Sequence, residues 1–358
     1  MHRDVKVILD HADEEGRVCA TILHPKGNIA EFLLQEGLAK CADWSMRFYK
    51  LDPSKLRAAM ANAKNNRRRI WQNYQPPTAN LSETTLQGTV KQILTTDTIL
   101  LKVPNKPDMK ITFSSVRALN KTDFGEKWAN EITKAENAKK GGKVPFSPVL
   151  DIPVNFDAKK FLIEKIGKKK VRVVIDYVQE AREIDIAVGT EKLEKRSFPK
   201  RTCCSVFIGE TNIAEALASR GYVKVITHGS NDDNRSSEYD KLTQAEEKAK
   251  KESRGCYAKN LSLPRIQDIN GKERATPYFS SWQRTGRFNA IVDYVFSGNR
   301  LKCYVPKDNV NIMVIMAGIE CPRTGQMKGG VRITPSQPFA EEAQAFTTDA
   351  IMQTEVSY

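Results

Sequence analysis

Apolar and polar positions follow the same order in two stretches of the chain. Residues 27–41 read GNIAEFLLQEGLAKC and residues 211–225 read TNIAEALASRGYVKV. In each stretch the apolar residues recur at the spacing of an amphipathic helix. Asn28 and Asn212 stand at the N-cap positions, and the glutamate three residues later can complete a capping box. The pattern therefore predicts two short helices with the same start signal.

Both predicted helices also share an end signal and the same neighbours. Gly37 and Gly221 stand where a left-handed residue ends a helix. An apolar segment with β-type composition precedes each helix, and a charged helical segment follows it. Because the two copies lie roughly 185 residues apart, they indicate tandem domains rather than a short solenoid repeat. We expect Leu217, on the apolar face of the second copy, to be buried.

The elements between these copies predict one complete unit over residues 76–262. Its predicted strands are 88–94, 98–103, 109–116, 171–178 and 201–208, and its predicted helices are 155–166, 212–220 and 236–252. Five strands in this order fit the OB-fold, a small Greek-key barrel. Residues 1–75 predict the C-terminal half of such a unit, and residues 263–358 predict its N-terminal part. The expected fold class is α+β, mainly β: tandem OB barrels with packed helices.

Two segments around these strands carry further expectations. Residues 54–71 have a helical apolar pattern with a basic end, and we expect a single helix there. Residues 121–147 are rich in Lys, Gly and Asn, and we expect a long polar loop.

Charge indicates the class of partner. The chain has 57 Lys and Arg against 43 Asp and Glu, a formal net charge of +14. Such a balance favours an anionic partner, nucleic acid first and a membrane surface second. A lysine-rich surface without a binding site remains the alternative. No apolar run is long enough to span a bilayer.

Cysteine usage and the N-terminal residues bear on the compartment. The seven cysteines are an odd number without a CxxC motif, which favours free thiols in a reducing compartment. The first residues lack the apolar core of a signal peptide. We expect a cytoplasmic protein that also enters the nucleus.

The repeated pattern resembles a known family. A strand, Gly16-Arg17, a second strand, Asn-x-x-Glu-x-Leu, Gly-Leu-Ala-Lys and a Lys/Ala-rich helix ending in Ile70-Trp71 are similar to staphylococcal nuclease. Several such domains in tandem resemble Tudor staphylococcal nuclease, a eukaryotic repeat family. The resemblance implies the end of a second repeat, a complete third repeat and the start of a fourth. The aromatic cage of the family's Tudor domain is not among these residues.

The resemblance also implies a catalytic set. The single-domain enzyme cuts phosphodiesters with Ca²⁺ held by two aspartates, a glutamate as general base and two strand arginines. The metal and the guanidinium groups stabilise charge on the phosphate in the transition state. In the complete unit Asp97 matches the first aspartate and Arg201 one arginine. Thr112 occupies the other arginine position, Arg117 the second aspartate and Asn120 the base.

The partial units are also incomplete. In residues 263–358, Asn299 replaces the first aspartate, Ile315 the arginine and Arg323 the base. Glu320 keeps a carboxylate at the second metal position there. In residues 1–75, Arg17 matches the strand arginine. The remnants of the set are therefore Asp97, Arg201, Arg17 and Glu320. The arginines either bind phosphate or are ordinary strand residues. Asp97 is either a turn-stabilising residue or a weak metal candidate, and Glu320 is a solvated or ion-paired carboxylate.

Basic runs supply further candidates for nucleic-acid binding. They are Arg67, Arg68, Arg69, Lys139, Lys140, Lys143, Lys168, Lys169, Lys170 and Arg172, beside Arg17 and Arg201. Each run alone is typical of a solvated face, and cations at the end of a helix also suit its dipole. On tandem OB barrels together, they favour a groove that follows a phosphate backbone.

The function implied by the resemblance is an RNA-binding scaffold in RNA-mediated gene silencing, within the RNA-induced silencing complex, and in gene regulation. The expected partners are double- or single-stranded RNA, silencing-complex proteins and transcription proteins, with no membrane and no small-molecule cofactor. One alternative is a Ca²⁺-dependent endonuclease that cleaves double-stranded RNA. A second is a protein-interaction or coactivator module whose basic charge meets acidic partners.

Overall fold

The computed structural model describes most of the chain, in several segments. These are residues 4–12, 16–74, 85–126, 128–130, 132–134, 152–188, 192–228, 234–263, 266–269, 272–325, 327–328, 331–332 and 335–357. The chain divides into two compact units. The first comprises Met1–Leu86, Thr112–Arg117 and Arg172–Lys259, and the second Gln87–Ile111, Ala118–Val171 and Asn260–Tyr358. Each unit therefore gathers segments that are far apart in sequence.

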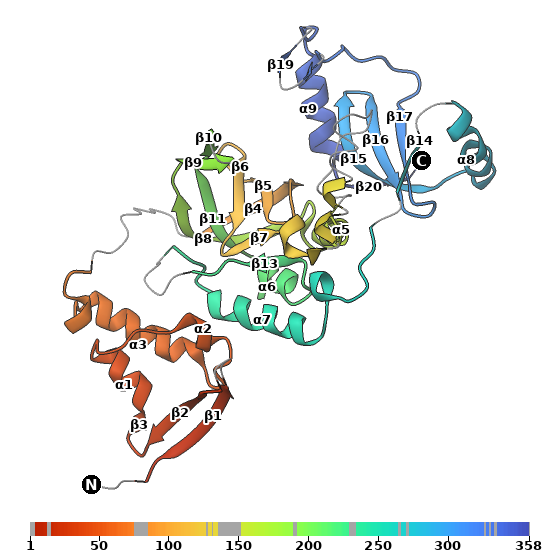
Figure 1. Ribbon diagram of the computed structural model, residues 1–358. Coiled ribbons are helices and arrows are strands. Elements are labelled where there is room, and N and C mark those ends of the chain that lie inside the picture. The colour runs from red at the N-terminus through yellow and green to blue at the C-terminus, as the bar shows by residue number, and fades with distance from the viewer. Residues whose placement is uncertain are drawn as a thin grey trace. The chain divides into compact units, whose positions relative to one another are not determined.

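Residues 4–74 form a small antiparallel sheet followed by helices (Figure 1). The elements are β1 (Lys6–Ala12), β2 (Val18–His24), β3 (Gly27–Asn28), α1 (Ile29–Gln35), α2 (Asp43–Met46), α3 (Pro53–Asn65) and the 3-10 turn η1 (Arg69–Trp71). The strand order is β1-β2-β3. Leu34, Leu56, Met60 and Trp71 form the core between the helices. These helices share buried side chains, whereas much of the sheet stays exposed.

A six-stranded sheet confirms the predicted barrel. Its strands are β4 (Thr85–Ile93), β5 (Thr98–Lys102), β6 (Met109–Phe113), β8 (Lys170–Gln179), β11 (Arg201–Ile208) and β12 (Thr211–Asn212). The strand order is β12-β11-β6-β5-β4-β8, and β11 also pairs with β8. This additional pairing brings the sheet back on itself, so five strands close in the order of an OB-fold. The predicted α+β class with OB barrels is confirmed.

Helices and short elements surround the barrel strands. They are β7 (Val116–Ala118), which pairs with β13 (Val223–Val225), and η2 (Lys121–Asp123), α5 (Asn155–Ile166), α6 (Ile213–Ala218), α7 (Tyr239–Lys251) and η3 (Gly255–Tyr257). Helix α6 packs against α7 and β11. Leu217 on α6 is fully buried, as predicted.

Residues 266–357 contain a second sheet. It consists of β14 (Gln267–Ile269), β15 (Asn289–Ser297), β16 (Arg300–Val305), β17 (Val310–Ile315) and β20 (Glu355–Ser357), in the order β14-β17-β16-β15-β20. The remaining elements here are α8 (Lys272–Thr285), α9 (Ala340–Ile351) and the hairpin of β18 (Met327–Lys328) with β19 (Val331–Arg332). Tyr278 and Trp282 of α8 pack against the buried face of this sheet.

The predicted asparagine caps and glycine ends of the two helices α1 and α6 are confirmed. The Asn28 side chain accepts a hydrogen bond from the Ala30 N–H at 3.0 Å, and Asn212 accepts one from the Ala214 N–H at 2.9 Å. Gly37 and Gly221 have φ of +64° and +66°. These signals act within a few residues, so they operate alike in both copies.

Two expectations about local structure are wrong, and several further elements were not expected. Helix α3 ends at Asn65 instead of continuing to residue 71, because Arg67 and Arg69 adopt positive φ and η1 starts anew. Where a polar loop was expected over 121–147, the described part contains η2 and helical residues between 126 and 134, and residues 135–147 lie outside the described residues. The hairpin of β9 (Arg182–Val188) and β10 (Lys192–Phe198) was not predicted, nor were β14 and α8. β9 and β10 pair with each other, whereas β14 pairs in parallel with β17, so of these strands only β14 depends on a distant partner.

All seven cysteines are free, as expected, and five of them are buried. Burial raises the pKa of the Cys41 and Cys204 thiols. These two thiols are therefore kept in the unreactive neutral form. The three-part division at residues 75 and 262 stays a prediction.

Candidate nucleic-acid interface

Asp97 stabilises the hairpin between β4 and β5. Its Oδ1 accepts hydrogen bonds from the hydroxyls of Thr95 at 2.6 Å and Thr98 at 3.1 Å. Its Oδ2 accepts a hydrogen bond from the Ala118 N–H at 2.9 Å, at the end of β7. Both carboxylate oxygens are therefore engaged by the protein, which supports the turn-stabilising interpretation.

The position of the general base is occupied by a helix cap. The Asn120 side chain accepts from the Thr122 N–H at 3.0 Å, and Asp123 accepts from the Asn120 N–H at 2.8 Å. This reciprocal capping box starts η2. A carboxamide in this role has no proton-accepting function at neutral pH, so Asn120 is structural.

Thr112 and Arg117 belong to the first compact unit, as does Arg201. Thr112 is buried in β6, where its hydroxyl cannot replace a phosphate-binding guanidinium. Arg117 is half-buried in β7 and places a positive group where the family has a metal-binding carboxylate. Asp97 and Asn120 belong to the second unit.

Calcium does not fit this set of residues. Ca²⁺ requires six to eight oxygen ligands, usually with several carboxylates. Both Asp97 oxygens already accept protein hydrogen bonds, and Arg117 stands at the second carboxylate position. Within the described ranges, no group of three or more His, Cys, Asp or Glu side chains is placed to hold a metal.

The last repeat reproduces the hairpin contact without a carboxylate. The Asn299 side chain accepts from the Ser297 hydroxyl at 3.1 Å and donates to the Ile319 carbonyl at 3.0 Å. This arrangement corresponds to that of Asp97, with an amide N–H in place of one accepting oxygen. The position is therefore used for hairpin geometry in both repeats.

The other last-repeat positions are exposed. Glu320 lies 3.9 Å from Arg323, and both side chains are more than four-fifths exposed. This is the solvated, weakly ion-paired carboxylate that the sequence predicted. Ile315, at the phosphate-binding arginine position, is 64% exposed.

The two strand arginines remain accessible. Arg201 begins β11, pairs in register with Gln179 of β8 and is exposed. Arg17, which precedes β2, is exposed as well. Exposed guanidinium groups can hold phosphate oxygens without a metal.

The Arg67–Arg69 run has a structural role in part. Arg68 donates to the Gln35 carbonyl at 2.9 Å, and Arg69 donates to the Glu36 carbonyl and carboxylate. The hydrogen bond and positive charge of Arg69 lower the pKa of Glu36. These contacts satisfy the free carbonyls at the end of α1. Arg67 is exposed and is the member of the run best placed for phosphate.

The three lysines of the Lys168–Lys170 run differ in their contacts and exposure. Lys168 Nζ donates to the Asp349 carbonyl at 3.1 Å, and burial lowers the pKa of this ammonium. Lys169 Nζ donates to the Glu164 carbonyl at 2.8 Å, near the end of α5. Lys170 is exposed at the start of β8. Only Lys170 of this run is therefore a strong candidate for phosphate contact.

The remaining candidates for phosphate contact are Arg172 and the lysines near residue 140. The Arg172 guanidinium lies 4.2 Å from the centre of the Phe207 ring, a cation–π contact that accounts for its position. Lys139, Lys140 and Lys143 lie outside the described residues.

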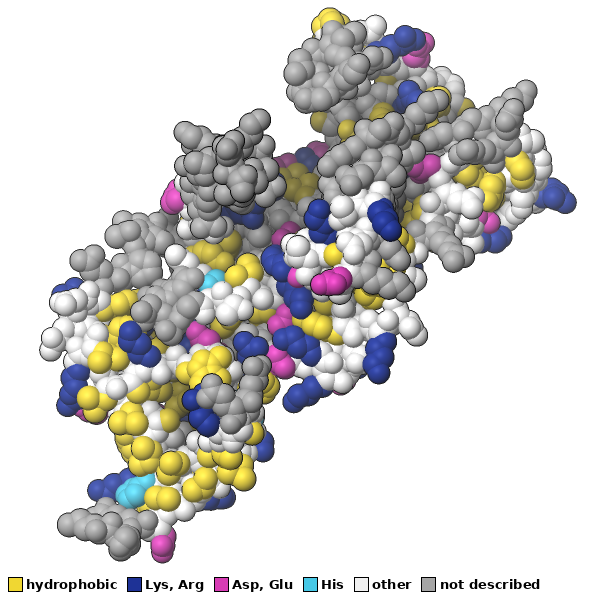
Figure 2. All heavy atoms as spheres, in the orientation of Figure 1, with side chains coloured by type: hydrophobic (Ala, Val, Ile, Leu, Met, Phe, Trp, Pro, Cys, Tyr) yellow, Lys and Arg dark blue, Asp and Glu magenta, His cyan; other side chains and the backbone are white. Residues whose placement is uncertain are grey.

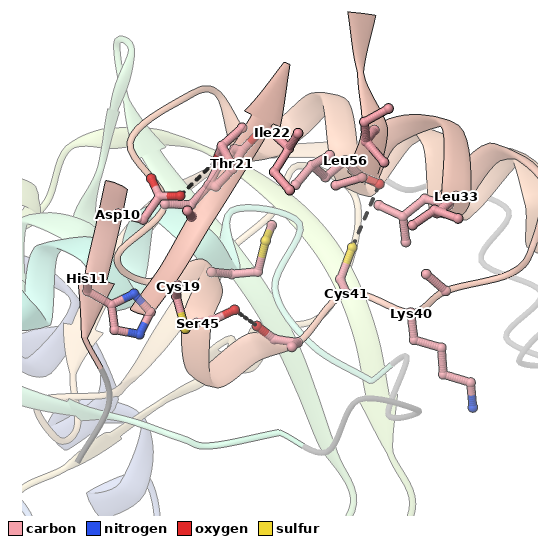
Figure 3. Close-up of a pocket in the computed structure, with 18 residues that line it drawn as sticks. Asp10, His11, Cys19, Thr21, Ile22, Leu33, Lys40, Cys41, Ser45 and Leu56 are labelled. Atoms are coloured by element: carbon pink, nitrogen blue, oxygen red, sulfur yellow. Dashed lines mark hydrogen bonds between the residues drawn. The ribbon is translucent and has the colours of Figure 1, made fainter. Parts of the chain in front are cut away.

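The described residues form no single basic patch on the face of the molecule shown in Figure 2. On the face shown in Figure 2, Lys and Arg side chains are scattered, while hydrophobic side chains gather over the N-terminal part. A hollow of about 350 Å³ opens there (Figure 3), lined mostly by apolar side chains such as Leu33 and Leu56. Its Asp10 carboxylate accepts from the Thr21 hydroxyl at 2.7 Å. An apolar lining of this kind is unsuited to a polyanion.

Sequence reasoning missed an ionic cluster in the first unit. Arg57 donates to the carboxylates of both Asp43 and Asp240, and Arg235 donates to Asp43 at 3.1 Å. Burial would lower the pKa of Arg57, but the hydrogen bonds and charge of Asp240 and then Asp43 raise it. The partners are up to 192 residues apart, so no local signal could have revealed them.

In the described part of the chain, no helix is both long and apolar enough to cross a bilayer.

Comparison with known proteins identifies the family. The model of the family described as "Staphylococcal nuclease homologue" matches residues 1–73 and 110–259. Staphylococcal nuclease domain-containing protein 1 of Drosophila melanogaster is 39% identical over 370 residues, covering 100% of this chain and 37% of its own length.

Two other relatives are similar to this chain over nearly its whole length. The protein of the same name from Schizosaccharomyces pombe (strain 972 / ATCC 24843) is 30% identical, covering 96% of this chain and 35% of its own length. Ribonuclease TUDOR 2 of Arabidopsis thaliana is 27% identical, and the match covers 99% of this chain and 36% of the relative's length. The chain thus spans little more than a third of the length of these relatives. The chain belongs to the staphylococcal nuclease homologues and carries nuclease-like domains in tandem.

Proposed function

We propose that this chain binds RNA through its nuclease-like repeats without metal-dependent cleavage. The proposal rests on one observation: the chain keeps the family's phosphate-binding arginines but has lost its metal-binding and general-base residues. Arg17 and Arg201 are retained and exposed, whereas the metal and base positions hold a hairpin-bound Asp97, Arg117 and the capping residue Asn120. Arginines of this kind contact phosphate, and the net charge of +14 favours a polyanion.

Duplex RNA binding at several salt concentrations tests this proposal. Affinity should fall with salt at a log–log slope of roughly −3 to −6, as expected for about four to six phosphate contacts. Arg201→Gln should weaken binding to all sequences alike and reduce the slope by about 1. Lys248→Gln, which removes an exposed cation at the end of α7, is the charge-matched control. A slope near zero, or equal losses in both variants, would contradict the proposal.

A Ca²⁺-dependent endonuclease is the second candidate, favoured by the name of the Arabidopsis thaliana relative, Ribonuclease TUDOR 2. Loss of a general base alone typically costs about 10²–10⁴ in rate. With excess protein and labelled duplex RNA, we expect binding that persists in chelator and no calcium-dependent cleavage. Cleavage that requires Ca²⁺ and disappears in an Asp97→Ala, Arg201→Ala double variant would establish the nuclease instead.

We further propose that the chain acts in RNA-mediated gene silencing and gene regulation, in the cytoplasm and the nucleus. The names of its relatives support an RNA-related role. The experiment is recovery of the tagged chain from cell extract with and without ribonuclease treatment. Silencing-complex proteins that are lost after the treatment would support the RNA-scaffold function. Acidic partners that are retained regardless would favour the protein-interaction alternative.

A further inference from the structure

The outward face of β15, β16 and β17 carries aromatic and basic side chains in adjacent rows. Figure 1 shows these three strands side by side. Tyr294 pairs in register with Lys302, which pairs with Met313 on the next strand. Phe296 follows two residues after Tyr294, so it shares the same face of the sheet. We name Tyr294, Phe296, Arg300 and Ile315 the aromatic face.

This face is exposed although it is largely apolar. Tyr294 is 49% exposed, Phe296 36% and Ile315 64%. The opposite face of the same strands is fully packed, since Val292, Leu301 and other side chains form the core of this repeat. Exposed aromatic groups gathered on one sheet face are typical of binding surfaces rather than of a core.

The two rings hold each other in place. The ring centres of Tyr294 and Phe296 are 4.9 Å apart with an angle of 71° between the rings. The Arg300 guanidinium lies 5.6 Å from the Phe296 ring centre. Because these side chains are already ordered by one another, a ligand that stacks on them incurs little additional loss of side-chain entropy.

The charge of the face comes from Arg300. Lys302 Nζ lies 3.2 Å from an Asp268 oxygen, so its charge is largely offset. Arg300 is exposed, and none of the carboxylates in the described segments forms an ion pair with it. The aromatic face therefore presents two rings beside one uncompensated guanidinium group.

The corresponding face of the complete repeat lacks this combination. There Gln92 pairs with Leu100 in the same register that joins Tyr294 to Lys302. Both side chains are half-buried, and neither is aromatic or charged. The hairpins of the two repeats otherwise match, so the fold does not require aromatic residues here.

We propose that the aromatic face of the last repeat binds unpaired RNA bases, which stack on Tyr294 and Phe296 while Arg300 contacts the adjacent phosphate. This inference rests on the proposed RNA binding and names the form of RNA that this face recognises. Bases within a duplex are stacked on one another and present no free face, so only unpaired nucleotides fit. An arginine beside the rings adds phosphate attraction and its own stacking surface.

The test compares a short oligouridylate with a duplex RNA of equal length. A Tyr294→Leu, Phe296→Leu double variant keeps the face apolar but removes both rings. We expect its affinity for the oligouridylate to fall roughly 5- to 100-fold for each stack lost, with duplex affinity unchanged. Phe279→Leu, at an exposed aromatic residue of α8, is the matched control and should bind like the parent.

Direct stacking is measured with 2-aminopurine in the oligonucleotide, whose fluorescence should change on binding to the parent and not to the double variant. Thermal melting of each variant confirms that the fold is retained. Unchanged oligouridylate affinity in a folded double variant would overturn this inference alone and leave the face to a protein partner. A parent that binds neither RNA form would overturn the proposed function and this inference together.

Discussion

The side-chain amide of Gln353 forms two hydrogen bonds with the backbone of Ile93. Gln353 Oε1 accepts from the Ile93 N–H and Gln353 Nε2 donates to the Ile93 carbonyl, each at 2.7 Å. Gln353 is buried and has a φ of +55°, the same value as Lys168 at the end of α5. Both residues follow the equivalent helix of their repeat, and both reach residues of the neighbouring repeat. The turn after this helix therefore joins consecutive repeats within the second unit.

Removal of the Gln353 amide should destabilise this junction. Gln353→Ala leaves the Ile93 N–H and carbonyl without their partner, at a cost of roughly 1–3 kcal/mol for each buried group. Gln344→Ala, on the preceding helix, removes a single hydrogen bond to the Val295 carbonyl and is the control. Denaturant unfolding together with hydrogen exchange of the Ile93 amide measures the effect. Equal exchange in parent and variant would show that this contact does not form in solution.

A methyl group at Gly221 should be costly for two separate reasons. Its Cβ would lie 2.4 Å from the Arg254 carbonyl oxygen, and its φ is +66°. Gly209 has a φ of +58°, but a Cβ added there would have no atom within 4 Å. Gly209→Ala therefore measures the cost of the positive φ alone. We expect about 1–2 kcal/mol for Gly209→Ala and roughly 1–3 kcal/mol more for Gly221→Ala. Equal unfolding free energies would mean that the chain after α7 moves aside.

Loss of one carboxylate from the part-buried ionic cluster of Arg57, Asp43, Arg235 and Asp240 should be measurable. Asp240 accepts from Arg57 Nε at 2.9 Å and from Nη2 at 2.7 Å, and its side chain is only 15% exposed. Asp240→Asn should reduce the unfolding free energy by roughly 1.5–3 kcal/mol, the range for hydrogen bonds to charged groups. Glu252→Gln removes the exposed ion pair to Arg254 and should cost about 0–1 kcal/mol. Similar losses in the two variants would refute a special role for the part-buried cluster.

The cap of α3 should make stability depend on pH. Hydrogen bonds from Ser54 lower the pKa of Asp52 below its ordinary value of 3.8. A carboxyl group with a lowered folded-state pKa contributes stability above that ordinary value, and the contribution is lost as pH falls through the folded pKa. Asp52→Ala should therefore reduce the melting temperature at neutral pH, with a smaller difference in acid. Asn28→Ala removes the cap of α1, which does not titrate, so its effect should not vary with pH.

Short-range features were predictable from the sequence because a few neighbouring residues determine them. Asn28 and Asn212 cap their helices, and Gly37 and Gly221 end them, since the groups they satisfy lie within one turn. Leu217 is buried as its helical spacing indicated. The barrel strands were predicted from their own residues as well, and their number and order fitted an OB-fold.

The sequence predicted those features of the candidate site that depend only on which residue type stands at each position. Arg117, at a metal-ligand position, and Asn120, at the base position, already argued against a nuclease centre. The sequence left two roles open for Asp97. Its hydrogen bonds with Thr98 and Ala118 support the turn-stabilising role. Arg69 looked available for phosphate, but the tertiary structure places it against the Glu36 carboxylate.

Long-range pairings were decided by the tertiary structure alone. Arg57 meets Asp240 across 183 residues, and Gln353 meets Ile93 across 260. No local pattern specifies such partners, because a polar side chain on a helix or turn is compatible with solvent until another segment covers it. The exposure of Tyr294 and Phe296 has the same origin. Their alternation predicts a strand, but which of its faces is covered depends on the segments that pack against it.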